Sequence, residues 1–397
     1  MRLAAAGCRN SASRDDLRVA SVFTSEMTIA VNGRFLEREM RGIGRYASGL
    51  AGALRGARPD VECVVSRRVA PHLEAEAAAL GARRVGPLSG PLWEQVTLPA
   101  YLAARGRPLL LNFVNTGPLL YGPQVTVVYD LAYLRHPETF SAAFLGLYRA
   151  VVPRIVARSR VVVTISEFIR RELMTTFGVP AERVSVVPCF VAPGLRDLAR
   201  AELDSGSGVA ATDYALVVGS LNARKNLRAA IAAFRRAAVP GLRLVVVGEG
   251  GDVFRPVDVG DGGGSDVAFV GAVSDAELVR LYKGARLLLF PSLYEGFGMP
   301  PIEAMVCGCP VVAARAASMP EVCGNAAYYV EPRDVDDMAA GIATVANDAA
   351  LRDSLRRRGH ERAARFTLDA SLARLQAAVD GVLAELAPRP RAAAHVA

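Results

Sequence analysis

The chain has 397 residues, of which 52% are hydrophobic and 22% are charged, and its formal net charge is +8. This balance is typical of two or three globular domains with sizeable cores, and it excludes a disordered or fibrous protein. Because no uncharged run reaches the roughly 18 residues that a membrane-spanning helix requires, we predict no integral membrane segment.

The six cysteines are scattered along the chain without the paired spacing of a zinc site. We therefore expect a reduced, cytoplasmic setting and no bound metal. The excess of positive charge suits an anionic partner. Charge alone leaves that partner open between a nucleotide, a lipid phosphate and nucleic acid.

The N-terminal segment, residues 1–26, is small, polar and charged, and it lacks the apolar stretch of a signal peptide. We expect either that Met27 is the physiological start or that residues 1–26 form a loose tail.

From Thr28 onward, short β-branched runs alternate with helix-length segments, which is typical of a parallel sheet covered by helices. We predict a first Rossmann-like domain over residues 27–201. Its predicted strands are TIAVN at 28–32, VECVV at 61–65, LLLNFV at 109–114, VTVVY at 125–129 and VVVTI at 161–165.

A polar stretch with serine and glycine, ELDSGSGVAATD at 202–213, has the composition of an interdomain linker. A second alternating series predicts another Rossmann-like domain over residues 214–366, so the fold class is α/β with two domains facing one another across a cleft. An amphipathic helix at 367–386, in a C-terminal region 367–397, should close the second domain or pack back across the cleft. The second set of predicted strands is YALVVG at 214–219, LRLVVVG at 242–248, VAFVG at 267–271, RLLLF at 286–290 and PVVAA at 310–314.

The stretch YEGFGMPPIEAM, at 294–305, places Glu295 and Glu303 eight positions apart with glycines and prolines between them. Glycine and proline disfavour a single helix, so we predict a loop that carries Glu295 and a helix, opening at Pro300, that carries Glu303. Both acids then face one ligand from different elements. Glu303 is positioned for a ribose diol and Glu295 for sugar hydroxyls.

The backbone amides of Phe297, Gly298 and Met299 come just before this predicted helix. Free amides at a helix N-terminus attract anions, so they form a candidate cradle for a phosphate or a sugar. The alternative is a proline-stopped turn whose acids cap the helix. That alternative is less attractive because a buried carboxylate needs partners.

Arg224 and Lys225 fall between the strand that ends at Gly219 and a following amphipathic helix. Ligands bind at the carboxyl ends of strands in a doubly wound sheet, and helix N-termini there favour anions. The pair therefore either clamps a diphosphate or forms a solvated basic turn. Lys225 is one of only two lysines, with Lys283, in a chain rich in arginine.

These motifs form an ordered set that resembles a known family. The E-x7-E spacing of EGFGMPPIE, followed by GCPVV, resembles the donor-site signature of retaining GT-B glycosyltransferases of family 4. The agreement covers residues 28–387 in consistent order and is more specific than any single motif. It includes GIGRYASGL, VVYDLAYLRHPETFS, ISEFIRRELMTTFGVPAERVSVVP, VGSLNARKNL and FVGAVSDAELVRLY.

The resemblance implies a role for each residue of the second-domain motifs. Glu303 would hold the nucleotide ribose and Glu295 the donor sugar. Arg224 and Lys225 would hold the diphosphate, and the cleft-facing Asp130 would lie near the acceptor.

Gly42 and Gly44, in RGIGRY, would let a loop of the first domain approach the phosphates closely, since glycine has no Cβ. Otherwise they belong to a glycine-tolerant turn between a strand and a helix. The sequence also departs from the family. Ser220 stands where many relatives carry arginine, so that phosphate charge is either missing or supplied by Arg224. Tyr129 stands where relatives commonly have histidine, so no imidazole is available there.

Two weaker signals have ordinary explanations. Asp334-Val-Asp336 matches the D-x-D of metal-dependent transferases, but it precedes DMAAGIATV, where an acidic helix cap is expected. A run of arginines interleaved with apolar residues suits either an anionic membrane surface or a solvated helix face. No nucleic-acid-binding module accompanies these arginines. The arginines are Arg149, Arg154, Arg158 and Arg160, and the apolar residues are Phe144, Leu145, Leu147 and Tyr148.

The resemblance implies a retaining glycosyltransferase without a metal or other cofactor, because Arg224, Lys225 and a helix N-terminus supply the positive charge. We expect it to move a mannose-like hexose from a nucleotide-diphosphate sugar to a glycan acceptor, lipid-linked, in surface polysaccharide or lipopolysaccharide biosynthesis. It would be cytoplasmic, with peripheral contact to the inner membrane and no nucleic-acid partner.

Two alternatives to this activity stay open. One is a non-catalytic nucleotide-sugar-binding protein. The other is a nicotinamide-dependent oxidoreductase that uses VVVGEGGDV, although its G-x-G-x-x-G pattern fails at Val253.

Overall fold

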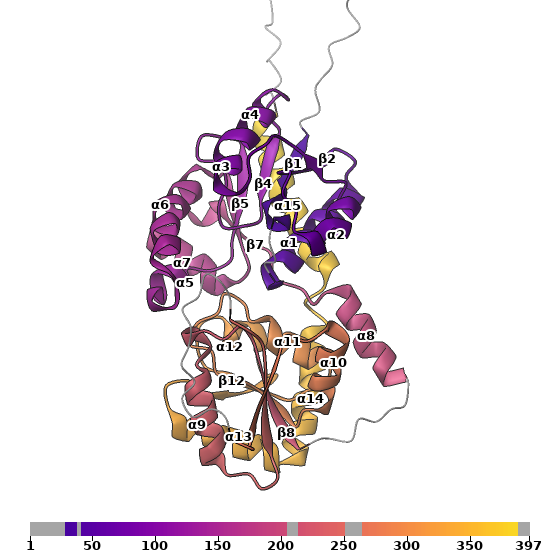
Figure 1. The fold of residues 1–397 in the computed structure, drawn as a ribbon, viewed down its shortest axis with the longest axis vertical. Helices are drawn as coiled ribbons and strands as arrows, with labels where there is room; N and C mark the ends of the chain where they lie inside the picture. Colours follow the sequence, from indigo (N-terminus) through magenta and orange to yellow (C-terminus); the bar gives the residue numbers. More distant parts are fainter. Residues whose placement is uncertain (1–27, 38–40, 205–212, 251–263, 388–397) are drawn as a thin grey trace, which may run out of the picture.

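The computed structural model describes residues 28–37, 41–204, 213–250 and 264–387, and it arranges them as two α/β domains stacked end to end (Figure 1). The tail predicted for residues 1–26 and the proposed start at Met27 lie outside the described residues. Among the helices that are described, none combines the length and the apolar character needed to cross a bilayer.

The first domain is built on a seven-stranded parallel sheet with the order β3-β2-β1-β4-β5-β6-β7. Its central strands are buried on both faces because helices cover each side, which explains their continuous apolar runs. The strands are β1 (Ile29–Asn32), β2 (Val61–Val65), β3 (Arg83–Arg84), β4 (Leu109–Asn112), β5 (Gln124–Val128), β6 (Val161–Thr164) and β7 (Val184–Val186).

The connections of the first domain are mostly helical. The α-helices are α1 (Arg41–Ala57), α2 (Glu74–Ala79), α3 (Gly90–Leu92), α4 (Leu98–Ala103), α5 (Ala132–Arg135), α6 (Ala142–Arg158) and α7 (Glu167–Phe177). The chain then leaves this domain through α8 (Pro193–Asp204), which lies against the second domain. Shorter helical turns are η1 (Gly33–Leu36), η2 (Pro71–Leu73), η3 (Trp93–Thr97), η4 (Pro137–Thr139) and η5 (Ala181–Arg183), of which η3 is π-helical.

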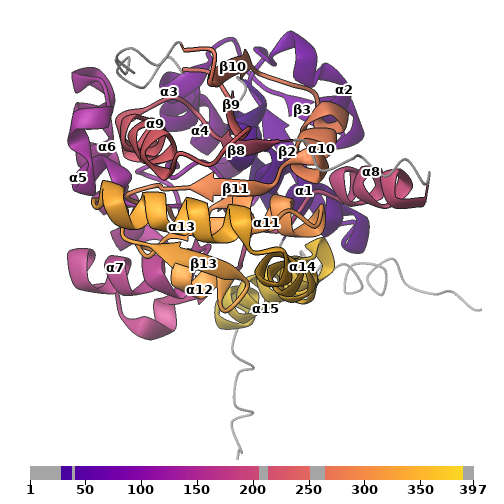
Figure 2. The ribbon, with the colours of Figure 1, turned by 90° about the horizontal axis from the view of Figure 1, so that it is seen from below.

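The second domain has a six-stranded parallel sheet with the order β10-β9-β8-β11-β12-β13. The helices α9 and α13 cover one face, while α10, α11 and α14 cover the other (Figure 2). The strands are β8 (Tyr214–Val218), β9 (Arg243–Val247), β10 (Val267–Gly271), β11 (Leu287–Phe290), β12 (Val311–Ala314) and β13 (Ala327–Val330). The helices are η6 (Ala223–Lys225), α9 (Leu227–Ala237), α10 (Asp275–Gly284), α11 (Met299–Val306), α12 (Met319–Cys323), α13 (Val335–Asn347), α14 (Ala349–Ala363) and α15 (Leu368–Leu386).

The predicted α/β class with two facing Rossmann-like domains is confirmed, and all ten predicted strands are present. Three further strands extend the sheets at their edges. β3 consists of two exposed arginines, β7 has three residues, and β13 carries two half-buried tyrosines, so none shows a sustained apolar run.

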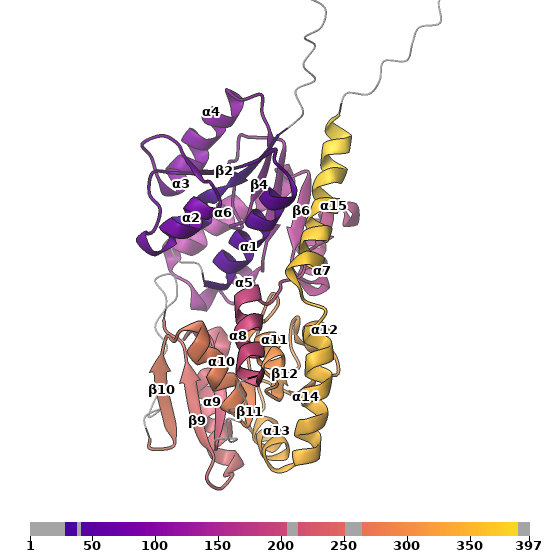
Figure 3. The same ribbon diagram turned by 90° about the vertical axis from the view of Figure 1, so that its right-hand side faces the viewer.

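The chain passes between the domains at two places that lie side by side. The first pass leads from β7 into α8, which packs against α10 of the second domain. The second pass leads from α14 into α15, which lies along the first domain beside α1 (Figure 3). The amide of Val191 donates to the carbonyl of Phe366 at 3.2 Å and ties the two passes together. Ser371 secures α15 through a hydrogen bond to the carbonyl of Pro188 at 2.8 Å.

A buried polar network fastens η3 to the ends of β1 and β4. Glu94, which is 1% exposed, accepts hydrogen bonds from Asn32 (2.9 Å) and Thr116 (3.0 Å). Arg34 completes the network with an ion pair to Glu94 at 2.6 Å. Because both carboxylate oxygens are paired, this charge is tolerated inside the domain.

Replacing this carboxylate tests the network. We expect Glu94→Ala to lower the free energy of unfolding by about 3–5 kcal/mol, because it leaves the Arg34 charge without its partner. The half-exposed Glu74, which pairs with Arg84 on the surface, is the matched control. Glu74→Ala should cost less than about 1 kcal/mol. Urea titration measures both, and equal losses in the two variants would contradict a structural role for Glu94.

Candidate functional site

The candidate site lies at the topological switch point of the second sheet. β8 and β11 are neighbours, but the chain leaves them toward opposite sides of the sheet, which opens a crevice at their carboxyl ends. The segment after β8 carries Arg224 and Lys225, and the segment after β11 carries Glu295. A hydrogen bond from the amide of Leu293 to the carbonyl of Arg224, at 2.9 Å, joins the two segments.

Glu295 is held between two cations in this crevice. Its carboxylate lies 2.9 Å from the guanidinium of Arg224 and 2.5 Å from the ammonium of Lys225. The Lys225 nitrogen also lies 5.1 Å from the centre of the Phe290 ring, a cation–π distance. Arg224 and Glu295 are each 8% exposed, so these charges interact in a largely desolvated setting.

The backbone of both segments is fixed by side chains around them. Asn226 adopts a left-handed conformation (φ 60°) and donates from its side chain to the carbonyls of Pro291 (3.2 Å) and Pro332 (2.6 Å). Ser318 donates to the carbonyls of Glu295 (2.9 Å) and Phe297 (3.1 Å). These hydrogen bonds hold the backbone on both sides of the ion-pair cluster in place.

The cluster shifts the pKa values of its own members. Burial would raise the pKa of Glu295, but Arg224 and Lys225 together lower it to about 2. Burial lowers the pKa of Lys225, against the opposing effect of Glu295. From the first domain, Asp130 faces the same cluster, and burial raises its pKa despite the attraction of Arg224.

Glu303 lies outside this ion-pair cluster, on α11. It accepts a hydrogen bond from the Tyr282 hydroxyl at 3.1 Å, and burial raises its pKa. The first domain approaches it through Arg45, which opposes that shift and forms an ion pair with Asp275 at 2.5 Å. The two glutamates of the E-x7-E motif thus have different surroundings. Glu295 forms ion pairs with two cations, whereas Glu303 accepts a hydrogen bond from the Tyr282 hydroxyl and forms no ion pair among the described residues.

Three backbone amides stand at the start of α11. Gly298 has a φ of 90°, and an added Cβ would lie 2.3 Å from the Met319 methyl group, so glycine is required there. The Phe297 ring packs edge-on against Phe366, with centroids 5.2 Å apart. Within the described ranges, the amides of Phe297, Gly298 and Met299 have no hydrogen-bond partner. They are therefore available to an anion at the helix N-terminus.

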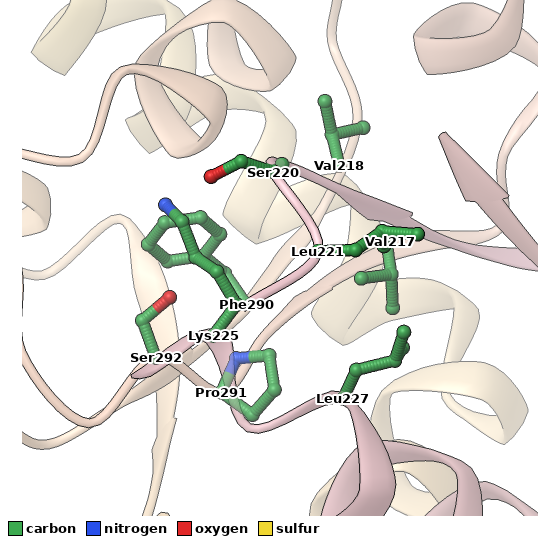
Figure 4. Close-up of a pocket in the computed structure, with 10 residues that line it drawn as sticks. Val217, Val218, Ser220, Leu221, Lys225, Leu227, Phe290, Pro291 and Ser292 are labelled. Atoms are coloured by element: carbon green, nitrogen blue, oxygen red, sulfur yellow. The ribbon is translucent and has the colours of Figure 1, made fainter. Parts of the chain in front are cut away.

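A pocket opens beside Lys225 at the carboxyl ends of β8 and β11 (Figure 4). In this view the Lys225 amine points toward the Ser220 hydroxyl, and the Ser292 hydroxyl lies on the other side of the amine. Ser292 is 2% exposed, and its hydroxyl has no hydrogen-bond partner among the described residues. Buried polar groups are normally paired, so this hydroxyl and the lysine suit a polar or anionic ligand.

The residue before Glu295 anchors the crevice to the first domain. The Tyr294 hydroxyl donates to the carboxylate of Glu172 and accepts from the amide of Leu131 at 3.1 Å. Its ring contacts those of His136 and Phe168, at centroid distances of 5.8 Å and 5.7 Å. The tyrosine is 5% exposed, so the second domain inserts an aromatic side chain into the first.

Two further contacts hold the domains together at this point. The Ser166 hydroxyl donates to the carbonyl of Gly296 at 2.7 Å. The Glu321 carboxylate of the second domain accepts from the amides of Glu167 (2.7 Å) and Phe168 (2.8 Å), at the N-terminus of α7. A negative charge is favourable at a helix N-terminus, so this contact stabilises the arrangement in which the two domains touch, here called the closed arrangement.

The structure brings Asp130 of the first domain close to the cluster of Arg224, Lys225 and Glu295. Gly42 and Gly44 differ from the prediction, because they lie in the first turn of α1 and not in a loop. The helical spacing of IGRYASGLAGAL begins at Ile43, and the helix starts two residues earlier, at Arg41. A Cβ added at Gly42 would meet no atom within 4 Å, so that glycine faces open space.

The positions that depart from the family are also structurally explained. Tyr129 points into the first domain, where its hydroxyl donates to the carbonyl of Phe113 at 2.9 Å. Ser220 accepts a hydrogen bond from the Asn222 side chain at 2.9 Å. Asp334 caps α13 by accepting from the amides of Asp336 (2.9 Å) and Asp337 (3.0 Å), which confirms the predicted helix cap.

Sequence reasoning missed the residues that join the domains. Tyr294 stands inside the quoted motif, and its position next to Glu295 was the one available signal. Its partner Glu172 and the helix-capping Glu321 lie far away in the chain. Their pairing depends on how the domains meet, which no local pattern encodes.

Comparison with known proteins places these features in context. Residues 207–362 match the family described as glycosyl transferases group 1, and residues 40–194 match glycosyltransferase family 4. The O-antigen chain mannosyltransferase B of Escherichia coli is 30% identical over 277 residues, which span 64% of this chain and 71% of that protein.

Solved structures share the fold. Sucrose-phosphate synthase from Thermosynechococcus elongatus superposes with a TM-score of 0.66 at 20% identity, over 90% of this chain and 99% of that one. HepE of Anabaena, solved in complex with UDP and glucose, has a TM-score of 0.66 at 18% identity, over 89% of this chain and 100% of that one. Both similarities support a two-domain GT-B fold.

The contact at Gly296 yields a test of domain closure. A Cβ at this position would lie 2.2 Å from the carbonyl oxygen of Tyr129, across the domain boundary. We expect Gly296→Ala to disfavour the closed arrangement by about 1–3 kcal/mol, the usual cost of overpacking. Small-angle X-ray scattering should then give a larger radius of gyration. Gly146→Ala, where nothing lies within 4 Å, is the control, and an unchanged radius in both variants would refute the closed contact.

The raised pKa of Asp130 yields a test of pH dependence. The folded state prefers the protonated acid, so the ionised form costs stability at neutral pH. Asp130→Asn should therefore raise the free energy of unfolding at neutral pH. As the pH falls toward the ordinary value of 3.8, the wild-type acid takes up its proton and the difference should vanish. Urea titrations across this range would count against the assignment if the difference stayed constant.

Proposed function

We propose that this chain, which belongs to the group 1 glycosyltransferases, transfers a hexosyl group from a nucleotide-diphosphate sugar to a hydroxyl of a glycan with retention of anomeric configuration. Glycosyltransferase activity follows from the family. The donor, the acceptor and the stereochemistry are our proposal, and the observation that carries it is the Arg224–Glu295–Lys225 cluster beside a pocket at the switch point.

The leaving diphosphate would bind near Arg224 and Lys225. Both cations lie in a site with little water, where they stabilise a developing negative charge far more than in solution. The free amides of Phe297, Gly298 and Met299 would add the positive end of α11. Gly42 would leave room on the first-domain side, at the N-terminal turn of α1 with Gly44.

Glu303 would accept hydrogen bonds from the nucleotide ribose, and Glu295 would contact the hydroxyls of the donor sugar. Glu295 is paired with both cations, so a bound diphosphate would share them. This exchange keeps the buried charges paired in both states, which avoids the large cost of an isolated buried ion.

Retention requires that the acceptor hydroxyl attack the anomeric carbon on the face from which the diphosphate departs. The bond from that carbon to the acceptor oxygen forms as its bond to the phosphate oxygen breaks. The acceptor proton passes to the leaving phosphate oxygen. No basic side chain is needed at position 129, where the tyrosine hydroxyl is engaged with Phe113. Asp130 lies on the acceptor side of the cleft, where it orients the hydroxyl.

The similarity to an O-antigen mannosyltransferase supports a mannose-like donor sugar and a role in surface polysaccharide or lipopolysaccharide biosynthesis. We propose a lipid-linked glycan acceptor and action on the cytoplasmic side of the inner membrane, through peripheral contact. The reaction would need no metal or other cofactor, because the chain supplies its own cations at the diphosphate site.

The deciding experiment incubates the protein with a panel of nucleotide sugars in EDTA and follows thermal shift, then donor turnover. NMR of the product linkage from an α-linked donor should show an α-linked product. A β-linked product, or turnover that returns only with Mn²⁺ or Mg²⁺, would overturn the mechanism. Donor binding without turnover on any acceptor would instead favour a non-catalytic binding protein.

The two lysines of the chain provide a matched pair of variants. We expect Lys225→Ala to weaken nucleotide-diphosphate binding about tenfold or more, since a charge-assisted hydrogen bond is worth about 1.5–3 kcal/mol. The rate constant kcat should fall further, by about a hundredfold, because the lysine acts on charge that develops during transfer. Lys283→Met, in α10, should leave both quantities unchanged. Calorimetry and initial rates measure them, and equal behaviour of the two variants would disprove the role of Lys225.

A further inference from the structure

The exposed apolar side chains of this protein are concentrated on the first domain. Among the described residues, the large hydrophobic side chains that are exposed include five in this domain and two on β10. Three of the five are the most exposed of the whole set: Leu120 at 82%, Leu92 at 65% and Val96 at 56%. Single exposed apolar residues are common, but a local group of large ones marks an interaction surface.

These three side chains belong to two segments that are tied together. Leu92 and Val96 are four residues apart on the helical run through α3 and η3, so they project on the same side. Between them, the Gln95 amide binds the loop before β5, donating to the carbonyl of Gly117 and accepting from the amide of Leu119, both at 2.9 Å. This clamp brings Leu120 next to the helical pair.

Two arginines from other segments bind the loop that carries Leu120, one on each side of that leucine. Arg158, from the end of α6, donates to the carbonyl of Leu119, and Arg107 donates to the carbonyl of Gly122 at 3.0 Å. Both side chains are exposed, and neither has an ion-pair partner within the part of the chain that the structure describes. We call Leu92, Val96, Leu120, Arg107 and Arg158 the distal patch.

The chain around the distal patch lacks acidic residues. No aspartate or glutamate occurs between Glu94 and Asp130, and none occurs between Glu138 and Glu167. Glu94 itself is buried and paired with Arg34. Arg105, in the first of these stretches, pairs with Glu62 of β2 at 3.8 Å. Arg107 and Arg158 have no such acid in their own segments, unlike the arginines of an ordinary solvated face.

The distal patch begins at the end of the first domain that lies away from the cleft, where Arg107, Arg158 and Leu120 stand. Leu92 and Val96 extend it along α3 and η3, whose Glu94 is bound to the carboxyl ends of β1 and β4. Arg107 stands two residues before β4, and the Leu120 loop leads into the start of β5, so both stand at the amino ends of parallel strands. The switch-point crevice is formed at the opposite edge, where the carboxyl ends of the strands meet the second domain. Figure 1 shows α4, which follows η3, at the end of the first domain farthest from the second.

We propose that the distal patch docks on a bilayer that contains anionic phospholipid. The leucines and valine would enter the boundary between headgroups and acyl chains, while the two guanidinium groups remain at the level of the phosphates. The use of this contact, which is to hold the chain on the membrane that carries a lipid-linked acceptor, rests on the proposed function. The contact itself depends only on the exposed residues and their charge.

The combination of groups distinguishes a lipid surface from a second copy of the chain. A symmetric dimer would bring each patch against itself and place like charges of Arg107 and Arg158 close together, which is unfavourable. An anionic bilayer meets both requirements of the patch, because it accepts apolar side chains and supplies phosphates to the arginines.

Vesicle cosedimentation tests this proposal with the full chain and without nucleotide sugar or acceptor. Vesicles of phosphatidylcholine containing roughly 30% phosphatidylglycerol should bind the protein, and binding should fall as salt screens the arginines. Leu120→Ser should weaken binding about tenfold, and Arg107→Gln with Arg158→Gln about twentyfold or more. Equal binding to pure phosphatidylcholine, or no binding at low salt, would overturn the proposal.

Matched controls come from the second domain. Phe269→Ser, at a side chain that is 42% exposed on β10, and Arg243→Gln should bind vesicles like the wild type. Thermal unfolding confirms that each variant is folded. Losses as large as those of the patch variants would refute the assigned surface, as would a dimer that Leu120→Ser dissociates without any vesicle binding. Donor turnover in solution should be unchanged in the patch variants, so failure here and failure of the proposed transfer reaction are separate outcomes.

Discussion

A single buried carboxylate organises the crevice of the second domain. Glu295 would be costly to bury alone, and it is stable because Arg224 and Lys225, from a segment seventy positions earlier, hold it on both oxygens. The ends of β8 and β11 therefore cannot move independently of one another. The pocket, the orientation of the lysine and the start of α11 all follow from this arrangement.

The same loop also fixes the relation of the two domains. Tyr294 inserts into the first domain immediately before Glu295, and Gly296 packs against the backbone after β5 immediately behind it. Three consecutive residues thus serve domain docking and charge pairing at once. A change in how the domains meet is transmitted directly to the carboxylate, without an intervening flexible segment.

The sequence was informative where structure depends on local order. Buried strands showed as apolar runs because both faces of each sheet are covered, and Asp334 was identified as a cap from its neighbours alone. The loop predicted at Gly42 was wrong because glycine suggested a turn, whereas the first turn of α1 includes this exposed glycine. The pairing of Tyr294 with Glu172 was inaccessible, since it depends on the docking of two surfaces that no short pattern describes.

The adjacent passes of chain between the domains have a mechanical consequence. The two connecting segments run along one margin of the interface, where the hydrogen bond between Val191 and Phe366 joins them. Two adjacent connections allow rotation about the line on which they lie. Twisting or sliding of one domain against the other would displace one connection relative to the other. We therefore expect the domains to separate by rotation about this line, which would withdraw Tyr294 from the first domain.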